Sequence, residues 1–207
     1  DGNASDMSGN GNHGTVNGAT LGTDRHGVAG KAYSFDGVDD FIDLNKSAYP
    51  VGGGVTLSFW AKGANDLPQN TTVIQATSTV TEDILKVHLP YSNFIYWDYG
   101  DGLGTPSRIQ KTAVTSHIKN KWTHWVFNAD KSNGVMKIIV DGIEWHTSGS
   151  KTLQSANLNI ISSFKVGKSV NQVAWKGILD ELKIYNRALS ADEIELLYRA
   201  ESPNHFV

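Results

Sequence analysis

Residues Lys121 to Gly142 read KWTHWVFNADKSNGVMKIIVDG, and this stretch carries a clear signal for β-structure. Thr123, Trp125 and Phe127 occupy alternate positions, so their side chains are expected to face a hydrophobic core. A cluster of Asn, Asp, Ser and Gly then separates this run from a second apolar run that begins at Val135. Such clusters typically end strands, so the stretch predicts two consecutive β-strands.

Runs of the same kind recur along the whole chain at short intervals, and each one ends at Gly, Asn, Asp or Pro. Strands with this spacing are typical of antiparallel sandwiches and barrels. No linker, low-complexity tract or internal repeat interrupts the pattern. We therefore predict a single all-β domain over residues 1–207, in which two antiparallel sheets form a sandwich. The predicted strands fall in residues 31–37, 40–44, 55–63, 71–78, 83–89, 93–99, 121–130, 135–142, 164–169 and 177–186.

One short helix is expected near the end of the chain, in the segment ALSADEIELLYRA. Ser190 fits the N-cap position, and Glu193 stands three residues later, which is the pattern of a capping box. Ile194, Leu197 and Tyr198 share one face of the helix and are expected to dock it on the edge of the sandwich. The helix is predicted to be structural.

Composition excludes several classes of protein. The 207 residues carry a formal net charge of −3 and no basic stripe, whereas nucleic-acid binders are typically basic. No apolar run approaches the roughly 20 residues that a membrane-spanning helix needs, so no membrane insertion is expected. The chain has no cysteine, which excludes a disulfide framework and a thiolate metal site.

Three segments together resemble bacterial laminin-G-like domains with the concanavalin A-like jelly-roll fold. These segments are DMSGNGNHGTVNGA, GKAYSFDGVDDFIDL and GILDELKIYNRALSADEIELLY, and the strands at 55–62 and 121–142 fit the same pattern. The resemblance implies a two-sheet jelly roll that is one module of a large secreted protein. It also implies that the module binds glycans, often with calcium. The same fold serves some glucanases and polysaccharide lyases, so fold alone does not fix the function.

The distribution of acidic residues argues against catalysis. Glycosidases bring two carboxyl groups to one bond, about 5 to 9.5 Å apart. The acidic pairs of this chain, Asp39–Asp40, Glu82–Asp83 and Asp180–Glu181, are adjacent in sequence, and adjacent strand residues point to opposite faces. The alternating acids of the glucanases with this fold, and the Arg, Gln-x-His and Tyr-x-Lys set of the related lyases, are absent. The chain is therefore predicted not to be an enzyme.

The stretch HLPYSNFIYWDYGDG, residues 88–102, is the strongest candidate for a ligand site. Sugar sites combine aromatic rings, which contact C–H faces, with a few polar groups that bind hydroxyls. In a strand over 94–99, Phe94, Tyr96 and Asp98 project to one side, and Ile95, Trp97 and Tyr99 project to the other. Either set can be the core, so a purely structural role for these rings is as well supported as a ligand site. The predicted ligand-binding residues here are His88, Tyr91, Trp97, Asp98, Tyr99, Asp101 and Arg108.

Alternation places two further aromatic side chains on the outside of the sandwich. In the segment TLSFWAK, Leu57 and Phe59 fit the core face, which leaves Trp60 on the outer face. The same rule puts His124 outside, between Thr123 and Trp125. Trp60 and His124 are therefore candidates to extend a sugar groove. The alternative is that a loop covers Trp60.

A calcium site is expected close to the start of the sequence. Calcium binds six to eight oxygen atoms from carboxylates, Asn side chains and backbone carbonyls. Asp6 and Asn12 lie in a glycine-rich segment, and the meeting of the first and last strands is expected to bring Asp180 close to it. The predicted ligands are Asp6, Asn12, Asp180 and Asp40. The alternative is that these residues only form Asx turns.

The sequence as a whole predicts a non-catalytic, extracellular carbohydrate-binding module, stabilised by calcium and covalently part of a larger protein. Its expected partner is a glycan or polysaccharide. A glycan-degrading enzyme of the same fold is the first alternative. An adhesin module that binds peptides or acts as a spacer is the second.

Overall fold

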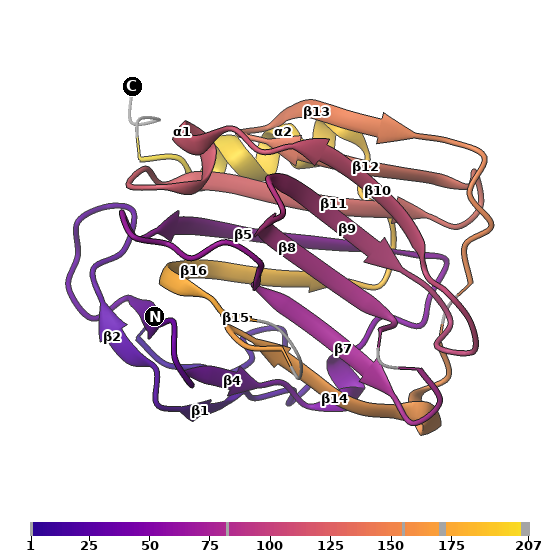
Figure 1. Cartoon of the computed structure of the whole chain (residues 1–207), viewed down its shortest axis with the longest axis horizontal. Helices are drawn as coiled ribbons and strands as arrows, with labels where there is room; N and C mark the ends of the chain where they lie inside the picture. Colours follow the sequence, from indigo (N-terminus) through magenta and orange to yellow (C-terminus); the bar gives the residue numbers. More distant parts are fainter. Residues whose placement is uncertain (1, 82, 155, 170–172, 204–207) are drawn as a thin grey trace.

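The computed structural model shows a sandwich of two antiparallel seven-stranded sheets with one helix of three turns (Figure 1). It describes residues 2–81, 83–154, 156–169 and 173–203. The predicted fold, an all-β two-sheet jelly roll with a short helix after the last strand, is confirmed.

The first sheet, called sheet A, has the strand order β1-β4-β14-β7-β8-β9-β10. Because neighbours in this order are often distant in sequence, the sheet depends on long-range pairing, as in β14 with β4 and β7. The strand bounds are β1 Thr15–Asn17, β4 Phe41–Asp43, β14 Ile161–Val166, β7 Ile74–Ser78, β8 Leu85–Tyr91, β9 Phe94–Tyr99 and β10 Ser107–Thr112.

The second sheet, called sheet B, has the strand order β13-β12-β11-β5-β16-β3-β2. Residues 121–142 form β11 and β12, which pair as expected for consecutive antiparallel strands. The strand bounds are β13 Ile143–Ser148, β12 Val135–Val140, β11 Thr123–Asp130, β5 Gly54–Gly63, β16 Lys176–Tyr185, β3 Ala32–Asp36 and β2 Thr20–Gly22.

Several short elements join the sheets. Two residues of β6 pair in parallel with two residues of β15. Two 3₁₀ turns and a single helical turn complete the connections, and no helix among the described residues has the length and apolarity needed to cross a bilayer. The bounds are β6 Thr71–Thr72, β15 Val173–Ala174, η1 Lys46–Ala48, α1 Thr115–Ile118 and η2 Leu158–Ile160.

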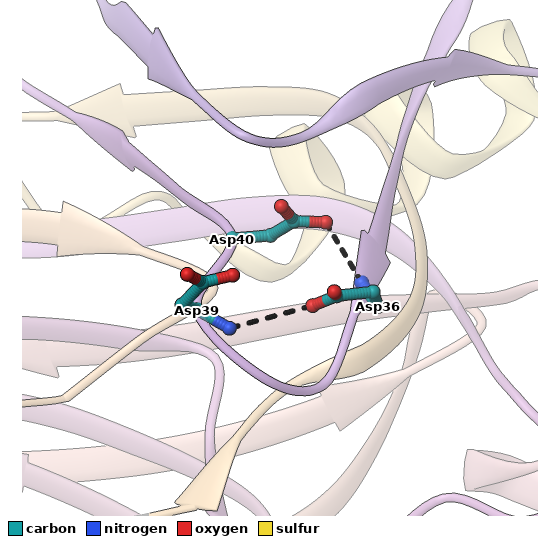
Figure 2. Close-up of side chains that lie close together, drawn as sticks. All are labelled: Asp36, Asp39 and Asp40. Atoms are coloured by element: carbon teal, nitrogen blue, oxygen red, sulfur yellow. Dashed lines mark hydrogen bonds between the residues drawn. The ribbon is translucent and has the colours of Figure 1, made fainter.

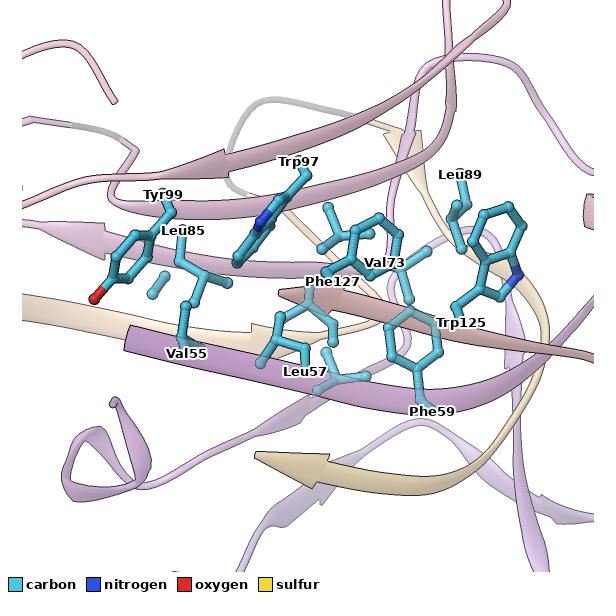
Figure 3. Packing of buried hydrophobic residues seen from close by; sticks show 14 of the residues in the cluster. Val55, Leu57, Phe59, Val73, Leu85, Leu89, Trp97, Tyr99, Trp125 and Phe127 are labelled. Carbon is cyan, nitrogen blue, oxygen red and sulfur yellow. The ribbon is translucent and has the colours of Figure 1, made fainter. Parts of the chain in front are cut away.

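The core fills the space between the sheets with alternate side chains of each strand (Figure 3). Leu57 and Phe59 of β5, together with Trp125 and Phe127 of β11, face inward, as the alternation predicts. Phe59 and Phe127 stack with ring centroids 5.9 Å apart. Burial of these large side chains is the main source of stability of the fold, because each removes a large apolar area from water.

The helix α2, Ala191–Glu201, begins at Ser190 with the predicted capping box. The Ser190 side chain accepts a hydrogen bond from the Glu193 N–H, and the Glu193 carboxylate accepts one from the Ser190 N–H. The helix does not dock on the sandwich edge. Instead, Ile194 packs with Val126 and Ile139, which lie on the outer side of sheet B, so the helix covers part of this outer face.

Candidate functional site

The outer face of sheet A carries a cluster of aromatic rings centred on Tyr96. The ring of Tyr96 has its centroid 5.7 Å from that of His88, and 5.9 Å from those of Tyr91 and Phe94. His88 and Tyr91 come from β8, and Phe94 and Tyr96 from β9. We call these four residues the aromatic cluster. Its rings meet edge to face or tilted, which are the favoured arrangements of aromatic pairs.

Arg108 of β10 lies directly against this cluster. Its guanidinium carbon is 4.8 Å from the centroid of the Tyr96 ring, within range for a cation–π contact. Nε and Nη2 each donate a hydrogen bond of 2.6 Å to a different carboxylate oxygen of Asp98. The Arg108 side chain is 49% exposed, whereas that of Asp98 is fully buried. The buried carboxylate therefore holds an exposed guanidinium in a fixed position.

The surroundings set the protonation of these groups. Burial raises the pKa of Asp98, and the hydrogen bonds and positive charge of Arg108 act against this rise. The same hydrogen bonds raise the pKa of Arg108. Burial lowers the pKa of His88 to about 4, so its ring is neutral at pH 7. His88 Nδ1 lies 3.0 Å from the carbonyl oxygen of Thr71 and donates to it, because a carbonyl can only accept.

A second charge pair lies beside the first on the same face. Lys86 Nζ is 2.5 Å from a carboxylate oxygen of Asp83, and Gln75 also donates to Asp83. Lys86 is directly opposite Asp98 in the β8–β9 register. Among the residues that the structure describes, the charged side chains next to the aromatic cluster thus form two ion pairs, Arg108 with Asp98 and Lys86 with Asp83. The cluster offers rings and hydrogen-bond donors without a net local charge.

The structure brings together four of the predicted ligand-binding residues, namely His88, Tyr91, Asp98 and Arg108. His88 and Asp98 are buried and support the cluster, whereas Arg108 is exposed. Tyr96 and Phe94 were not among the predicted site residues, although alternation placed both on the face of Asp98. The aliphatic residue Ile95 on the opposite face was a signal for which face is the core.

The prediction that Trp97 and Tyr99 bind ligand is wrong. Both side chains are fully buried between the sheets, where their rings stack at 6.1 Å (Figure 3). Trp97 also donates its Nε1 hydrogen to the carbonyl of Asn128 in β11. Asp101 lies in the turn after β9, where its carboxylate accepts a hydrogen bond from the Leu103 N–H. Its observed role is that of a turn residue.

The prediction of a groove at Trp60 and His124 is also wrong. Both lie on the outer face of sheet B, as alternation predicts, but both are buried under α2. Tyr198 of the helix stacks on both rings, and Trp60 donates a hydrogen bond of 2.8 Å to Glu201. His124 Nε2 lies 2.8 Å from the Ser58 hydroxyl. A helix, rather than a loop, therefore covers this face.

The predicted calcium site, with Asp6, Asn12, Asp180 and Asp40 as its ligands, is not formed as a single site. Asp6, Asn12 and Asp180 line one groove, so the expected proximity of the first segment to β16 is present. However, the Asp6 carboxylate accepts hydrogen bonds from the Ser8 and Asn12 N–H groups and closes its own loop. Asp180 is turned towards Arg25, at 2.5 Å. A guanidinium at this distance disfavours a cation, so these three residues do not fit a calcium site.

Asp40 lies in a different group, together with Asp36 and Asp39 in the turn between β3 and β4 (Figure 2). One oxygen from each carboxylate lies within 4.8 Å of the other two. Asp40 accepts a hydrogen bond from the Asp36 N–H, and Asp36 accepts one from the Val38 N–H. Within the described residues, no Lys or Arg forms an ion pair with any of the three. Carboxylate oxygens of this kind fit calcium as part of its ligand set.

Two of the three adjacent acidic pairs do not lie in regular strands, so adjacency in sequence does not place their side chains on opposite faces. Asp39 and Asp40 lie in a turn, and a β-bulge at Asp180 and Glu181 breaks the alternation of β16. The carboxylates of Asp180 and Glu181 both approach the Arg25 guanidinium, at 2.5 and 3.9 Å. In the pair Glu82–Asp83, Glu82 lies outside the described residues. Asp83, Asp98 and Asp180 each form an ion pair with a basic side chain, which disfavours a role as a catalytic acid or nucleophile.

Comparison with known families gives one match that covers most of the chain. Residues 36–195 match the sequence profile of the concanavalin A-like lectin/glucanases superfamily. No curated protein matches the sequence.

Several solved structures share the fold. The receptor binding domain of botulinum neurotoxin C/D mosaic serotype superposes with a TM-score of 0.73 at 17% identity, covering 95% of this chain and 48% of that one. The binding domain of botulinum neurotoxin DC in complex with SialylT superposes with a TM-score of 0.69 at 17% identity, covering 95% of this chain and 48% of that one. The binding domain of Paraclostridial Mosquitocidal Protein 1 superposes with a TM-score of 0.71 at 17% identity, covering 95% of this chain and 49% of that one. The chain thus spans about half the length of these structures, and at such identities the likeness concerns the fold alone.

Proposed function

We propose that this chain, which belongs to the concanavalin A-like lectin/glucanase superfamily, is a non-catalytic carbohydrate-binding module. The observation that carries the proposal is the aromatic cluster with Arg108 on the outer face of sheet A. It combines aromatic rings with a fixed donor group, which is the mixture that sugar sites use. Residues 1–207 are proposed to act as a single domain.

The lack of net local charge favours a neutral glycan over an acidic one. Arg108 uses Nε and Nη2 for Asp98, so its remaining donors suit hydroxyl groups. The charge of Lys86 is neutralised by its ion pair with Asp83, and His88 is uncharged at pH 7 because its pKa is about 4. Gln110, opposite Tyr96 in the register and exposed, adds an amide that can both donate and accept.

Replacement of Tyr96 by alanine is expected to weaken binding of a neutral oligosaccharide about tenfold or more, since a central ring is lost. Arg108→Gln should weaken it similarly by removing the guanidinium. Titration calorimetry against ligands found on a glycan array measures both effects. Lys165→Ala is the matched control, because β14 lies three strands away from β9 in the same sheet and Lys165 is opposite Gln75 of β7. Equal affinities for wild type and Tyr96→Ala would contradict the proposal.

The rival function is glycan degradation, because the superfamily includes glucanases. Incubation with a panel of polysaccharides separates the two proposals. Release of oligosaccharides that Asp98→Asn or Asp83→Asn abolishes would replace the binding module by an enzyme. Surface adhesion in the absence of any glycan array signal would favour the peptide-binding or spacer alternative.

We place the module outside the cell, as part of a larger secreted or surface protein. The matched binding domains support this proposal, since each belongs to a chain about twice as long as the present one. A glycan ligand is the partner expected for such a setting.

Calcium is proposed as a stabilising ion at Asp36, Asp39 and Asp40. A millimolar addition of calcium should raise the melting temperature by several degrees, because an ion that binds only the folded state stabilises it. Scanning calorimetry with calcium and with chelator measures the shift. Asp39→Asn should abolish it, whereas Asp43→Asn, which alters a nearby carboxylate that contacts Lys165, should not. An unchanged melting temperature in chelator would remove calcium from the proposal.

A further inference from the structure

The sequence contains three Asn-Gly pairs, at positions 10–11, 17–18 and 133–134. In an Asn-Gly pair the backbone nitrogen of Gly can attack the Asn side chain and form a succinimide, because Gly carries no side chain that hinders the approach. The reaction also needs space, since a five-membered ring has to close between the two residues. The three pairs lie in different surroundings, so the structure distinguishes between them.

The pair Asn10–Gly11 lies at the exposed tip of a loop that belongs to no strand or helix. The base of this loop is held by Asp6, whose carboxylate accepts hydrogen bonds from the Ser8 and Asn12 N–H groups. Within the described residues, the hydrogen bonds of Asn10 go only to Ser8 Oγ, at 2.9 and 3.3 Å. The position of a Cβ atom on Gly11 would have open space around it, with no heavy atom beyond its chain neighbours within 4 Å.

The pair Asn17–Gly18 is held by sheet A. Asn17 is the last residue of β1 and pairs with Phe41 of β4, and its side-chain amide donates to the carbonyl oxygen of Thr15. A Cβ atom on Gly18 would lie 2.1 Å from a carboxylate oxygen of Asp40, so this backbone packs directly against the turn between β3 and β4. Rotation of these two residues towards a ring would collide with Asp40.

The pair Asn133–Gly134 lies in the turn between β11 and β12, where both residues are fixed. The Asp130 carboxylate accepts hydrogen bonds from the Asn133 N–H and from its side-chain amide, the latter at 2.6 Å. The Gly134 carbonyl accepts a hydrogen bond from the Lys151 N–H. A Cβ atom on Gly134 would lie 2.6 Å from the carbonyl oxygen of Lys151, which leaves no room for rotation.

We propose that Asn10 is a site of spontaneous deamidation in the folded protein, whereas Asn17 and Asn133 are protected. The Gly11 backbone nitrogen attacks the side-chain carbonyl carbon of Asn10, and the amide group leaves as ammonia with the proton of the Gly11 N–H. Water then opens the succinimide. Cleavage at the former side-chain carbonyl gives aspartate, and cleavage at the main-chain carbonyl gives isoaspartate. The net reaction consumes water and releases ammonia in equal amounts.

The products change the charge and the shape of the loop. Hydrogen bonds from Ser8 and Asn12 lower the pKa of Asp6, so its carboxylate is negative at pH 7 and repels a second carboxylate at position 10. Isoaspartate also lengthens the main chain between Asp6 and Asn12. We expect the hydrogen bond that joins these two residues to weaken. Because Asn10 and Asn12 line a groove of about 560 Å³ beside β16, the charge of that groove changes as well.

Peptide mapping by mass spectrometry tests the proposal on residues 1–207. The protein is incubated in mildly alkaline buffer, which favours deprotonation of the attacking nitrogen, and the products at the three positions are quantified over time. Deamidation at Asn10 should be at least about tenfold faster than at Asn17 and Asn133, because an open loop reacts without unfolding of the sandwich. Equal rates at the three positions, or no reaction at Asn10, would overturn the proposal.

Incubation in urea shows whether structure or local sequence causes the difference. In the unfolded chain all three pairs are accessible, so their rates should agree within about threefold. A preference for Asn10 that persists unchanged in urea would assign the cause to its sequence neighbours and contradict the structural explanation.

Two glycine variants locate the attacking group. Gly11→Ala should slow deamidation at Asn10 at least about tenfold, because a methyl group hinders the approach of the backbone nitrogen. Gly9→Ala is the matched control, since Gly9 and Gly11 both have a positive φ and open surroundings, so the two variants strain the loop alike. The control should change the rate by at most about twofold. An equal decrease in both variants would attribute the effect to strain and reject Gly11 as the nucleophile.

Discussion

Replacement of Trp97 by alanine should lower the free energy of unfolding by about 3–5 kcal/mol, the range for buried aromatic residues. The side chain is fully buried. Its ring stacks on Tyr99, and its ring centroid lies 5.8 Å from that of Phe127. Its Nε1 hydrogen bond to Asn128 links β9 to β11 across the core. Truncation creates a cavity and leaves this carbonyl without its donor, and both effects destabilise the fold. Urea unfolding, followed by circular dichroism, measures the change.

Tyr96→Ala is the matched control, since it alters the next residue of the same strand on the opposite face. It should cost less stability than Trp97→Ala, because Tyr96 is only partly buried. The two variants should also separate in function: Tyr96→Ala loses sugar affinity, whereas folded Trp97→Ala retains it. A loss below about 1 kcal/mol for Trp97→Ala would contradict the assignment of this ring to the core.

The sequence was sufficient for the fold because alternation has a period of two and strands here are bounded by turn formers. Thr123, Trp125 and Phe127 were assigned to the core face correctly, and all three are buried. Strands β1, β2, β10, β13 and β15 were not predicted. β13, which reads IEWHTS, is an exposed edge strand whose polar residues weaken the apolar signal.

The site was less predictable, because burial depends on elements that are distant in the sequence. Alternation divided residues 94–99 into two faces correctly, but both faces carry aromatic rings. Ile95 alone was a weak signal for the core face, and the structure settles it by pairing with β8, where Val87 stands opposite Trp97. Trp60 was correctly placed outside sheet B, yet Tyr198 and Glu201 bury it from 138 and 141 positions further along the chain. Local patterns contain no information about such a cover.

Replacement of Asp180 by alanine should cost about 3–5 kcal/mol, the usual effect of breaking a buried ion pair. The side chains of Arg25 and Asp180 are only 8% and 5% exposed, and their closest atoms are 2.5 Å apart. Arg25 also donates to the carbonyl oxygen of Glu201 and lies over the Trp60 ring, so the pair fastens the end of α2 to sheet B. Removal of the carboxylate leaves a buried guanidinium whose nearest remaining acid, Glu181, is 3.9 Å away. Equilibrium unfolding in urea measures the loss.

The double variant Arg25→Met with Asp180→Ala identifies the cause of that loss. If the cost arises from an unpaired charge, removing the charge as well should recover most of the stability, because apolar replacements of buried pairs are often neutral. If Asp180 instead held calcium, the loss would disappear in chelator and the second substitution would recover nothing. The structure predicts the first result, with the same destabilisation in calcium and in chelator, since the partner of Asp180 is a guanidinium. Recovery would also show that packing, rather than charge, holds α2 over Trp60 and His124. The packed helix explains why this face of the sandwich is closed to a ligand.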